Sequence, residues 1–246
     1  MSETSEQPVI LVENVDKVFT LRHTRSIKEY AVWTLRGRKG ELSETFKALN
    51  NVSLSIGKGE SVGLIGLNGS GKSTLLKLIS GVMQPDAGSV RISGLVAGLI
   101  EVGAGFHPDL TGRENVYLNG AILGMSEAEI ERKFPDILAF SEIEKFIDTE
   151  VKFYSSGMFL RLAFSVAIYS EPDIFLVDEV LAVGDEPFQR KCLKRIHELK
   201  AEGQTLVVVS HDLPKIHEFC DRGIMLEHGN LVFDGPIDQA VSRLKG

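Results

Sequence analysis

The sequence predicts an α/β fold in which a mixed sheet is covered by helices. Short runs rich in β-branched and aromatic residues alternate with helical patterns along the chain. Two of these runs, "IFLVDE" and "TLVVVSHD", are continuously apolar before they end in polar residues, as is typical of parallel strands that are buried on both faces. With 246 residues, 43% of them hydrophobic, the chain can bury one large core, or one core with a helical lobe attached.

The elements can be predicted in chain order. "VILVENVDKVFTL" indicates a strand, and "KALNNVSLSIGKGESVGLIG" indicates two more, joined by a turn at residues 57–59. "STLLKLISG" and "MFLRLAFSVAIYS" each indicate a helix. Between them, two Ser-x-x-Glu capping boxes, Ser126/Glu129 and Ser141/Glu144, open amphipathic patterns. We therefore expect one domain with a core of residues 9–105 and 151–236 and a helical subdomain of about 106–150.

Composition excludes several classes of protein. The formal net charge of -7 and the pI near 5.5 argue against nucleic acid as a partner. Cys192 and Cys220 lie far apart without CxxC spacing, which argues against a disulfide framework or a structural zinc site and fits the cytosol. No apolar run has the length of a signal peptide or a membrane helix, so a membrane role would require a partner.

A phosphate-binding motif follows the strand "SVGLIG". Gly66, Gly71, Lys72 and Ser73 satisfy G-x-x-x-x-G-K-[ST], and the motif opens a helix. Glycines let the backbone wrap around phosphate oxygens, and the helix N-terminus attracts negative charge. We expect Lys72 to reach the β- and γ-phosphates and the Ser73 hydroxyl to bind Mg²⁺. The alternative, a glycine-rich turn that binds nothing, does not account for the strand-loop-helix context. The residues expected to hold nucleotide here are Gly66, Leu67, Asn68, Gly69, Ser70, Gly71, Lys72, Ser73 and Thr74.

Two carboxylates end the buried run "IFLVDE", at the edge where open α/β sheets bind ligands. Asp178 is positioned for the Mg²⁺ shell, and Glu179 can polarise the water that attacks the γ-phosphate. His211, at the end of "TLVVVSHD", is a third candidate. Each has a simpler alternative, because two acids can form a solvated strand end and a single histidine is usually structural.

The motifs together resemble the nucleotide-binding subunits of ABC transporters. The resemblance extends from about residue 9 to residue 236. "YSSGM", residues 154–158, lies where that family carries L-S-G-G-Q, although only Ser155 and Gly157 keep the family's residue types. "LAVGD" resembles the D-loop and ends in Asp185, and His211 matches the family's switch histidine. The resemblance also implies a domain of the P-loop NTPase type with an antiparallel β subdomain and a helical subdomain.

The resemblance suggests two further site residues. Phe19 is the candidate for the aromatic that stacks on adenine, ahead of Tyr30, and an ordinary core aromatic is the alternative. The family usually carries a glutamine after the strand that leads into the helical lobe, where it senses Mg²⁺ and the membrane subunit. "GLIEVGAGFHPDLTGREN" contains no glutamine, so Glu101 is named as its substitute at the metal.

A narrower resemblance is to the bacterial polysaccharide exporters, which move O-antigen, teichoic acid or galactan. It is carried by "EVGAGFHPDLTGRENVYLNG", "YSSGM" and "DEVLAVGDEPFQRKC". It implies an ATPase, dependent on ATP and Mg²⁺, that drives export of a polyprenyl-diphosphate-linked glycan. It also implies a separate membrane permease, a head-to-tail homodimer and a peripheral place on the cytoplasmic face of the inner membrane. Because "LVFDGPIDQAVSRLKG" ends where the ATPase core should end, the chain resembles the short form without a carbohydrate-binding domain.

A basic insertion is expected at about residues 21–47. It carries seven basic residues against three acidic ones, in an otherwise acidic protein. Ile27, Tyr30, Ala31 and Thr34 fall at helical spacing. The segment can dock near anionic lipid, the glycan diphosphate or the permease, and the alternative is a helix that packs on its own sheet with a solvated basic face.

Other functions remain open at this point. An ABC ATPase of another transporter, an importer included, would share these motifs, because the fold does not fix the cargo. A soluble ABC ATPase that moves a protein or nucleic acid complex is disfavoured by the acidic charge and by the lack of a coiled-coil insert. A small-molecule kinase would leave "YSSGM", Asp185 and His211 unexplained.

Overall fold

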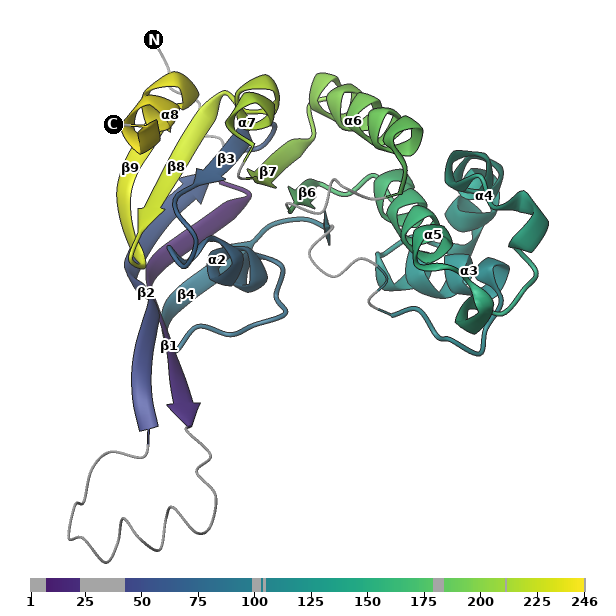
Figure 1. Cartoon of the computed structure of the whole chain (residues 1–246), viewed down its shortest axis with the longest axis horizontal. Helices are drawn as coiled ribbons and strands as arrows, with labels where there is room; N and C mark the ends of the chain where they lie inside the picture. Colours follow the sequence, from purple (N-terminus) through teal and green to yellow (C-terminus); the bar gives the residue numbers. More distant parts are fainter. Residues whose placement is uncertain are drawn as a thin grey trace, which may run out of the picture.

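The computed structural model describes residues 8–22, 43–98, 103, 105–178, 184–210 and 212–245. Three candidate site residues, Glu101, Glu179 and His211, lie outside the described residues, as does the basic insertion between residues 23 and 42. Figure 1 shows two parts side by side: a sheet-rich part that contains β1 and α8, and a part made of helices. The α/β fold class, with a mixed sheet, an antiparallel sheet and a helical part, is confirmed.

The first sheet is antiparallel, with strand order β2-β1-β4. Its strands are β1 (Ile10–Arg22), β2 (Ser43–Ile56) and β4 (Ala87–Ile92). β1 corresponds to the predicted strand "VILVENVDKVFTL". Beyond Ala87, the first residue of β4, the strands β1 and β2 continue as a two-stranded ribbon that projects from the molecule (Figure 1). In this ribbon Phe19 of β1 lies opposite Phe46 of β2.

The second sheet has the strand order β5-β6-β7-β3-β8-β9. Neighbouring strands are parallel except that β9 runs antiparallel to β8. The continuous apolar runs in the sequence are its central strands, as predicted, and every residue in them is buried. The strands are β3 (Ser61–Ile65), β5 (Val96–Gly98), β6 (Ile174–Val177), β7 (Thr205–Val209), β8 (Arg222–Glu227) and β9 (Asn230–Pro236).

Alternate residues of the central strands enter two different cores. Ile174 and Leu176 of β6 join a core with β1, β2 and the helix α2 (Lys72–Ile79), whereas Phe175 and Val177 join a core with the helices on the opposite face. These helices are α5 (Ser156–Tyr169), α6 (Glu186–Ala201), α7 (Leu213–Phe219) and α8 (Ile237–Lys245). The two-residue period of a strand therefore places the second sheet between two apolar layers.

The helical part has its own core. It contains α3 (Gly112–Ile122), α4 (Glu127–Ser141) and the short 3₁₀ turns η1 (Glu144–Phe146) and η2 (Val151–Phe153), and it packs on α5. Buried side chains from these elements form a separate apolar cluster with Leu162 and Val166 of α5. α5 also contributes Phe164 to the core between the second sheet and the helices that cover it, so this helix joins the two parts.

The capping boxes correct one prediction. Ser126/Glu129 forms the predicted box, but Ser141/Glu144 does not, because α4 continues through Ser141 and only a 3₁₀ turn follows. The Ser141 hydroxyl instead donates to the carbonyl of Leu138. A box that the sequence reading missed opens α3, where Thr111 and Glu114 bond reciprocally.

Two absences predicted from composition can be compared with the described residues. In these residues, no helix combines the length and apolar character that crossing a membrane requires. Cys192 and Cys220 are both free and buried, and burial raises the pKa of each thiol to about 12. Both thiols are therefore protonated at neutral pH, and neither is poised as a nucleophile.

The two Ser-x-x-Glu sites offer a test of the helix boundaries. Ser126→Ala removes an N-cap, so it should lower the free energy of unfolding by about 1 kcal/mol. Ser141→Ala should change it by less than about 0.5 kcal/mol, because the higher helix propensity of alanine offsets the lost hydrogen bond of this buried hydroxyl. The Leu138 carbonyl also still accepts the Glu142 N–H at 3.2 Å. Urea-induced unfolding of both variants measures the difference. Equal destabilisation by the two changes would contradict the boundary between α4 and η1.

Candidate functional site

The phosphate loop, residues 66–74, connects β3 to α2. It lies against the backbone of other strands at two glycines. A side chain on Gly66 would come within 2.3 Å of the Leu226 carbonyl oxygen, and one on Gly71 within 2.6 Å of the Ala48 carbonyl oxygen. Both glycines also have positive φ, 148° and 109°, which other L-residues rarely adopt. The motif glycines are therefore required by close packing and by conformation.

The side chain of Lys72 crosses the inside of the phosphate loop and binds its backbone carbonyl groups. Its side chain is buried, and its Nζ donates to the carbonyl oxygens of Gly66 at 2.8 Å and Leu67 at 3.0 Å. Gly71 is the N-cap of α2 and has no side chain that could accept a hydrogen bond from the first N–H groups of the helix. The loop thus presents an ammonium group and helix N–H donors together, which is the arrangement that binds phosphate.

The acidic strand end lies at the same edge of the sheet as the phosphate loop. Val177 of β6 is level with Val208 of β7, and Val209 is level with Leu64 of β3. Asp178 directly follows β6, which ends beside β7, and β7 in turn ends beside β3, the strand that leads to the phosphate loop. The side chain of Asp178 is half-buried. A carboxylate there and the Ser73 hydroxyl in the first turn of α2 are both oxygen ligands of the kind that Mg²⁺ prefers.

A pocket of about 180 Å³ opens over the phosphate loop. Its walls are the loop itself and two residues of β2, Phe46 and Ala48. Phe46 is 49% exposed, although it lies beside a binding loop. Phe19, the aromatic predicted for this role, lies directly opposite Phe46 across the β1–β2 pair, so both rings are on one face of the ribbon. Sequence reading missed Phe46, because it lies one residue before the predicted strand that begins at Lys47, within the segment interpreted as the basic insertion.

The signature segment, residues 154–158, forms the start of α5. The Ser155 hydroxyl caps the helix by accepting from the Met158 N–H at 3.2 Å. Tyr154 anchors the segment to the helical part, since its hydroxyl donates to the Phe146 carbonyl at 2.7 Å. Burial raises the pKa of Tyr154 to about 12, so the hydroxyl stays neutral and donates at physiological pH. The signature segment therefore still forms a capped helix N-terminus, although Tyr154, Ser156 and Met158 depart from the family pattern.

Asp185 lies beside the signature segment. It is the N-cap of α6 and accepts from the Phe188 N–H at 3.3 Å. It also accepts from Arg161 of α5 at 2.6 Å, a contact that sequence reading missed. Together they border an open hollow of about 490 Å³, which is also lined by Glu142, Ile143, Phe146, Ser155, Ser156, Gly157, Met158, Leu160 and Gly184.

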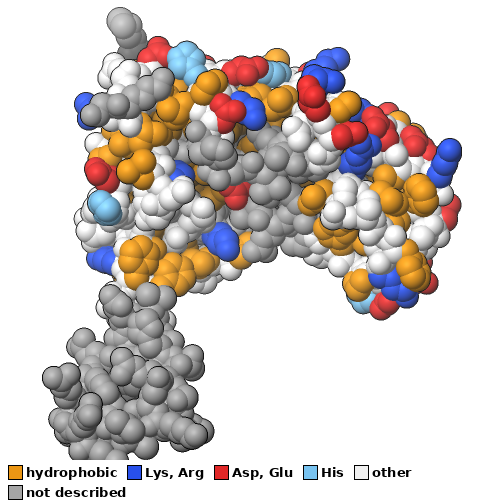
Figure 2. All heavy atoms as spheres, in the orientation of Figure 1, with side chains coloured by type: hydrophobic (Ala, Val, Ile, Leu, Met, Phe, Trp, Pro, Cys, Tyr) orange, Lys and Arg blue, Asp and Glu red, His pale blue; other side chains and the backbone are white. Residues whose placement is uncertain are grey.

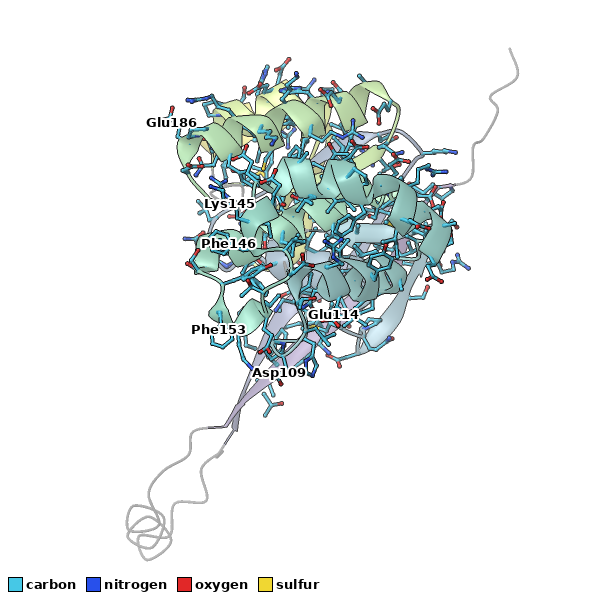
Figure 3. The ribbon with its side chains drawn as sticks, turned by 90° about the vertical axis from the view of Figure 1, so that its right-hand side faces the viewer. Asp109, Glu114, Lys145, Phe146, Phe153 and Glu186 are labelled. Atoms are coloured by element: carbon cyan, nitrogen blue, oxygen red, sulfur yellow. The ribbon has the colours of Figure 1, made fainter. Side chains whose placement is uncertain are left out.

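The hollow and the phosphate pocket share no lining residue. α2 belongs to the sheet-rich part, whereas the start of α5 belongs to the helical part (Figure 1). Seen from the helical side, Lys145, Phe146, Phe153 and Glu186 lie along one edge (Figure 3), and Phe146 also lines the hollow. The structure therefore brings Lys72, Ser73 and Asp178 to one edge of the sheet, and Ser155, Gly157 and Asp185 to a second site.

Comparison with known proteins agrees with this arrangement. Residues 49–182 match the family described as ABC transporter. The O-antigen export system ATP-binding protein RfbB of Klebsiella pneumoniae is 43% identical over 247 residues, which cover 97% of this chain and 98% of that protein. The teichoic acids export ATP-binding protein TagH of Bacillus cereus is 42% identical over 208 residues, which cover 85% of this chain but only 38% of TagH.

A solved structure extends the comparison to the fold. It is a dimeric ATP-binding cassette in a post-hydrolysis state with bound ADP and Pi, 26% identical to this chain, with a TM-score of 0.71. The alignment covers 93% of this chain and 98% of the cassette. The phosphate loop, the acidic strand end and the capped signature helix thus occur in a chain whose fold and sequence both match one family. The chain belongs to the ABC transporter family, in the group that contains the ATP-binding proteins of O-antigen and teichoic acid export systems.

Proposed function

We propose that this chain is the ATP-hydrolysing subunit of an ABC exporter that moves a polyprenyl-diphosphate-linked polysaccharide across the cytoplasmic membrane. The observation that carries the proposal is the pairing of a formed phosphate loop with near full-length similarity to an O-antigen export ATP-binding protein. A separate permease would provide the membrane path and hold the chain at the cytoplasmic face. The lipid-linked cargo and the peripheral location are parts of this proposal, and the names of the relatives, which are O-antigen and teichoic acids export ATP-binding proteins, support a glycan as the cargo.

The nucleotide roles follow the chemistry of the loop. Residues 66–74 bind the phosphates, and Lys72 neutralises the β- and γ-phosphate charge. Ser73 and Asp178 hold Mg²⁺, with Glu101 in the place of the family's glutamine. Bound Mg²⁺ supplies charge neutralisation to the phosphoryl oxygens. Glu179 polarises the attacking water and His211 contacts the γ-phosphate.

Two copies of the chain are needed to complete each ATP site. The phosphate pocket and the signature hollow have no residue in common, and the related cassette with ADP and Pi is dimeric. In a head-to-tail pair, Ser155, Gly157 and Asp185 of one subunit face the nucleotide on the phosphate loop of the other. Closure on ATP moves the helical subdomain, at about residues 106–150, and hydrolysis reopens the pair.

An apolar patch between the two parts fits the permease. Leu118 and Ile122 lie one turn apart on α3 and are 37% and 59% exposed. Leu95, before β5, is 49% exposed and lies against Gly124, just beyond α3. Hydrophobic side chains are also visible on the surface of the helical part in Figure 2. This patch includes Leu95, beside the core strand β5, and residues of α3 in the helical part. A permease bound here would therefore contact both parts of the chain.

The cargo can be tested with a hydrolysis-deficient subunit. Glu179→Gln should slow ATP hydrolysis by about 10²- to 10⁴-fold while ATP still binds, because the general base is lost but the phosphate loop is not. Cells that carry only this form should accumulate a glycan on a polyprenyl diphosphate, measured by mass spectrometry of their lipids. Lys72→Ala serves as a control that fails at nucleotide binding. An unchanged lipid profile with an inactive subunit would remove glycan export and leave the ATPase assignment in place.

The two aromatic residues of the ribbon can be distinguished by binding. Phe46→Ala should weaken ATP binding by about tenfold, since stacking on a base contributes about 1–3 kcal/mol. Phe19→Ala should weaken it equally only if its ring contacts the base directly. Tripolyphosphate, which has no base, should bind both variants as tightly as the wild type. If Phe46→Ala kept full affinity for ATP while Phe19→Ala lost it, Phe19 would be the stacking residue.

The apolar patch gives a prediction for the assembled exporter. Ile122→Glu should abolish co-purification with the permease, because a buried unpaired charge disfavours the contact. ATP binding by the isolated subunit should not change. Val82→Glu, which replaces an equally exposed apolar residue after α2, is the matched control and should retain the permease. Retention of the permease by both variants would place its docking surface elsewhere.

A further inference from the structure

Arg161 contacts carboxylates at the ends of two other helices. It lies in the second turn of α5, and its side chain is only 18% exposed. Nη1 donates to Glu142 Oε2 at 2.8 Å, and Nη2 donates to Asp185 Oδ1 at 2.6 Å. Its guanidinium carbon lies 4.8 Å from the centre of the Phe188 ring. The side chain therefore has a charged partner on each side and an aromatic face against it.

The two carboxylates that Arg161 bridges are helix caps: Glu142 is the C-cap of α4, and Asp185 is the N-cap of α6. Glu142 ends α4 in the left-handed conformation and also accepts from Lys191 of α6 at 3.0 Å. Lys191, with a smaller contribution from Arg161, holds the pKa of Glu142 below its ordinary value, so this carboxylate is ionised at neutral pH. Asp185 begins α6. Arg161 thus joins the end of α4, in the helical part, to the start of α6, which packs against the second sheet.

This junction borders the hollow that contains the signature segment. Arg161 and Asp185 line it together with Ser155 and Gly157. We propose that Arg161 is a positioning residue of the ATPase cycle, which holds Asp185 at a fixed place relative to the signature segment. Asp185 and the signature segment then contact the nucleotide of the other subunit together. This inference rests on the head-to-tail dimer proposed above.

The geometry requires arginine at this position. A planar guanidinium can donate to two carboxylates on different sides, whereas the ammonium of lysine is a point charge on a flexible stem. If the guanidinium is removed, Lys191 still pairs with Glu142. Within the described part of the chain, Arg161 is the cation that pairs with Asp185. Loss of the guanidinium therefore leaves Asp185 with its helix-capping bond from the Phe188 N–H, whereas Glu142 at the end of α4 keeps a cationic partner.

Dimerisation measures this role directly. In the Glu179→Gln background, Arg161→Met should weaken ATP-dependent dimerisation at least about tenfold, measured by sedimentation. Arg161→Lys should restore thermal stability but not dimerisation, because one ammonium cannot reach both carboxylates. ATP affinity of the single chain should be unchanged in both variants, since the phosphate loop is remote from Arg161. With Glu179 intact, kcat per subunit should fall and the apparent KM for ATP should rise at low subunit concentration, because ATP binding and dimerisation are linked.

Arg195→Met is the matched control. Arg195 is 15% exposed, donates to Glu198 and Glu202, and lies near the ring of Tyr169, but both carboxylates are within or at the end of its own helix, α6. This variant should lose similar stability and dimerise normally.

The possible failures of these experiments can be told apart. Normal dimerisation of Arg161→Met would overturn the inference, as would an equal loss in Arg195→Met. If the Glu179→Gln parent failed to dimerise with ATP, the proposed dimer itself would be wrong.

Discussion

The phosphate loop depends on close contact between backbones. Gly66 and Gly71 leave no room for a side chain against the Leu226 and Ala48 carbonyls, and the Gly229 N–H donates to the Ser70 carbonyl at 3.0 Å. The loop is therefore held between β2 and the turn that joins β8 to β9. Elements from the first sheet and from the far edge of the second sheet must both be in place before the loop has its shape. The binding site is thus a product of the whole sheet-rich part.

The second organising feature is the helix α5. Its first turn carries the signature segment, its middle contributes to the apolar cluster of the helical part, and Phe164 enters the core between the second sheet and the helices that cover it. Because one helix belongs to both parts, a movement of the helical part acts on the signature segment directly. The ion pairs of Arg161 connect the same helix to α4 and to the start of α6.

Local patterns predicted much of this structure. The apolar runs "IFLV" and "TLVVV" became central strands, and the glycine motif became the phosphate loop, because burial and conformation at these positions are set by nearby residues. The failed box at Ser141/Glu144 shows the limit of such patterns. Ser141 has the sequence of a cap, but α4 continues because Phe140 packs in the core and the helix ends where Lys191 and Arg161 bind Glu142. These partners are distant in sequence. The same holds for Phe46, since strand register placed it beside the loop.

The separation of the phosphate pocket from the signature hollow has a kinetic consequence. A catalytic centre that is divided between two copies makes the rate per subunit depend on subunit concentration. Under the proposed dimer, dilute chains bind ATP but turn it over slowly, and the reaction order in protein approaches two. A permease that holds two copies together raises their effective concentration. Hydrolysis would then be confined to assembled exporters, and a newly made, unassembled subunit would leave the cell's ATP intact.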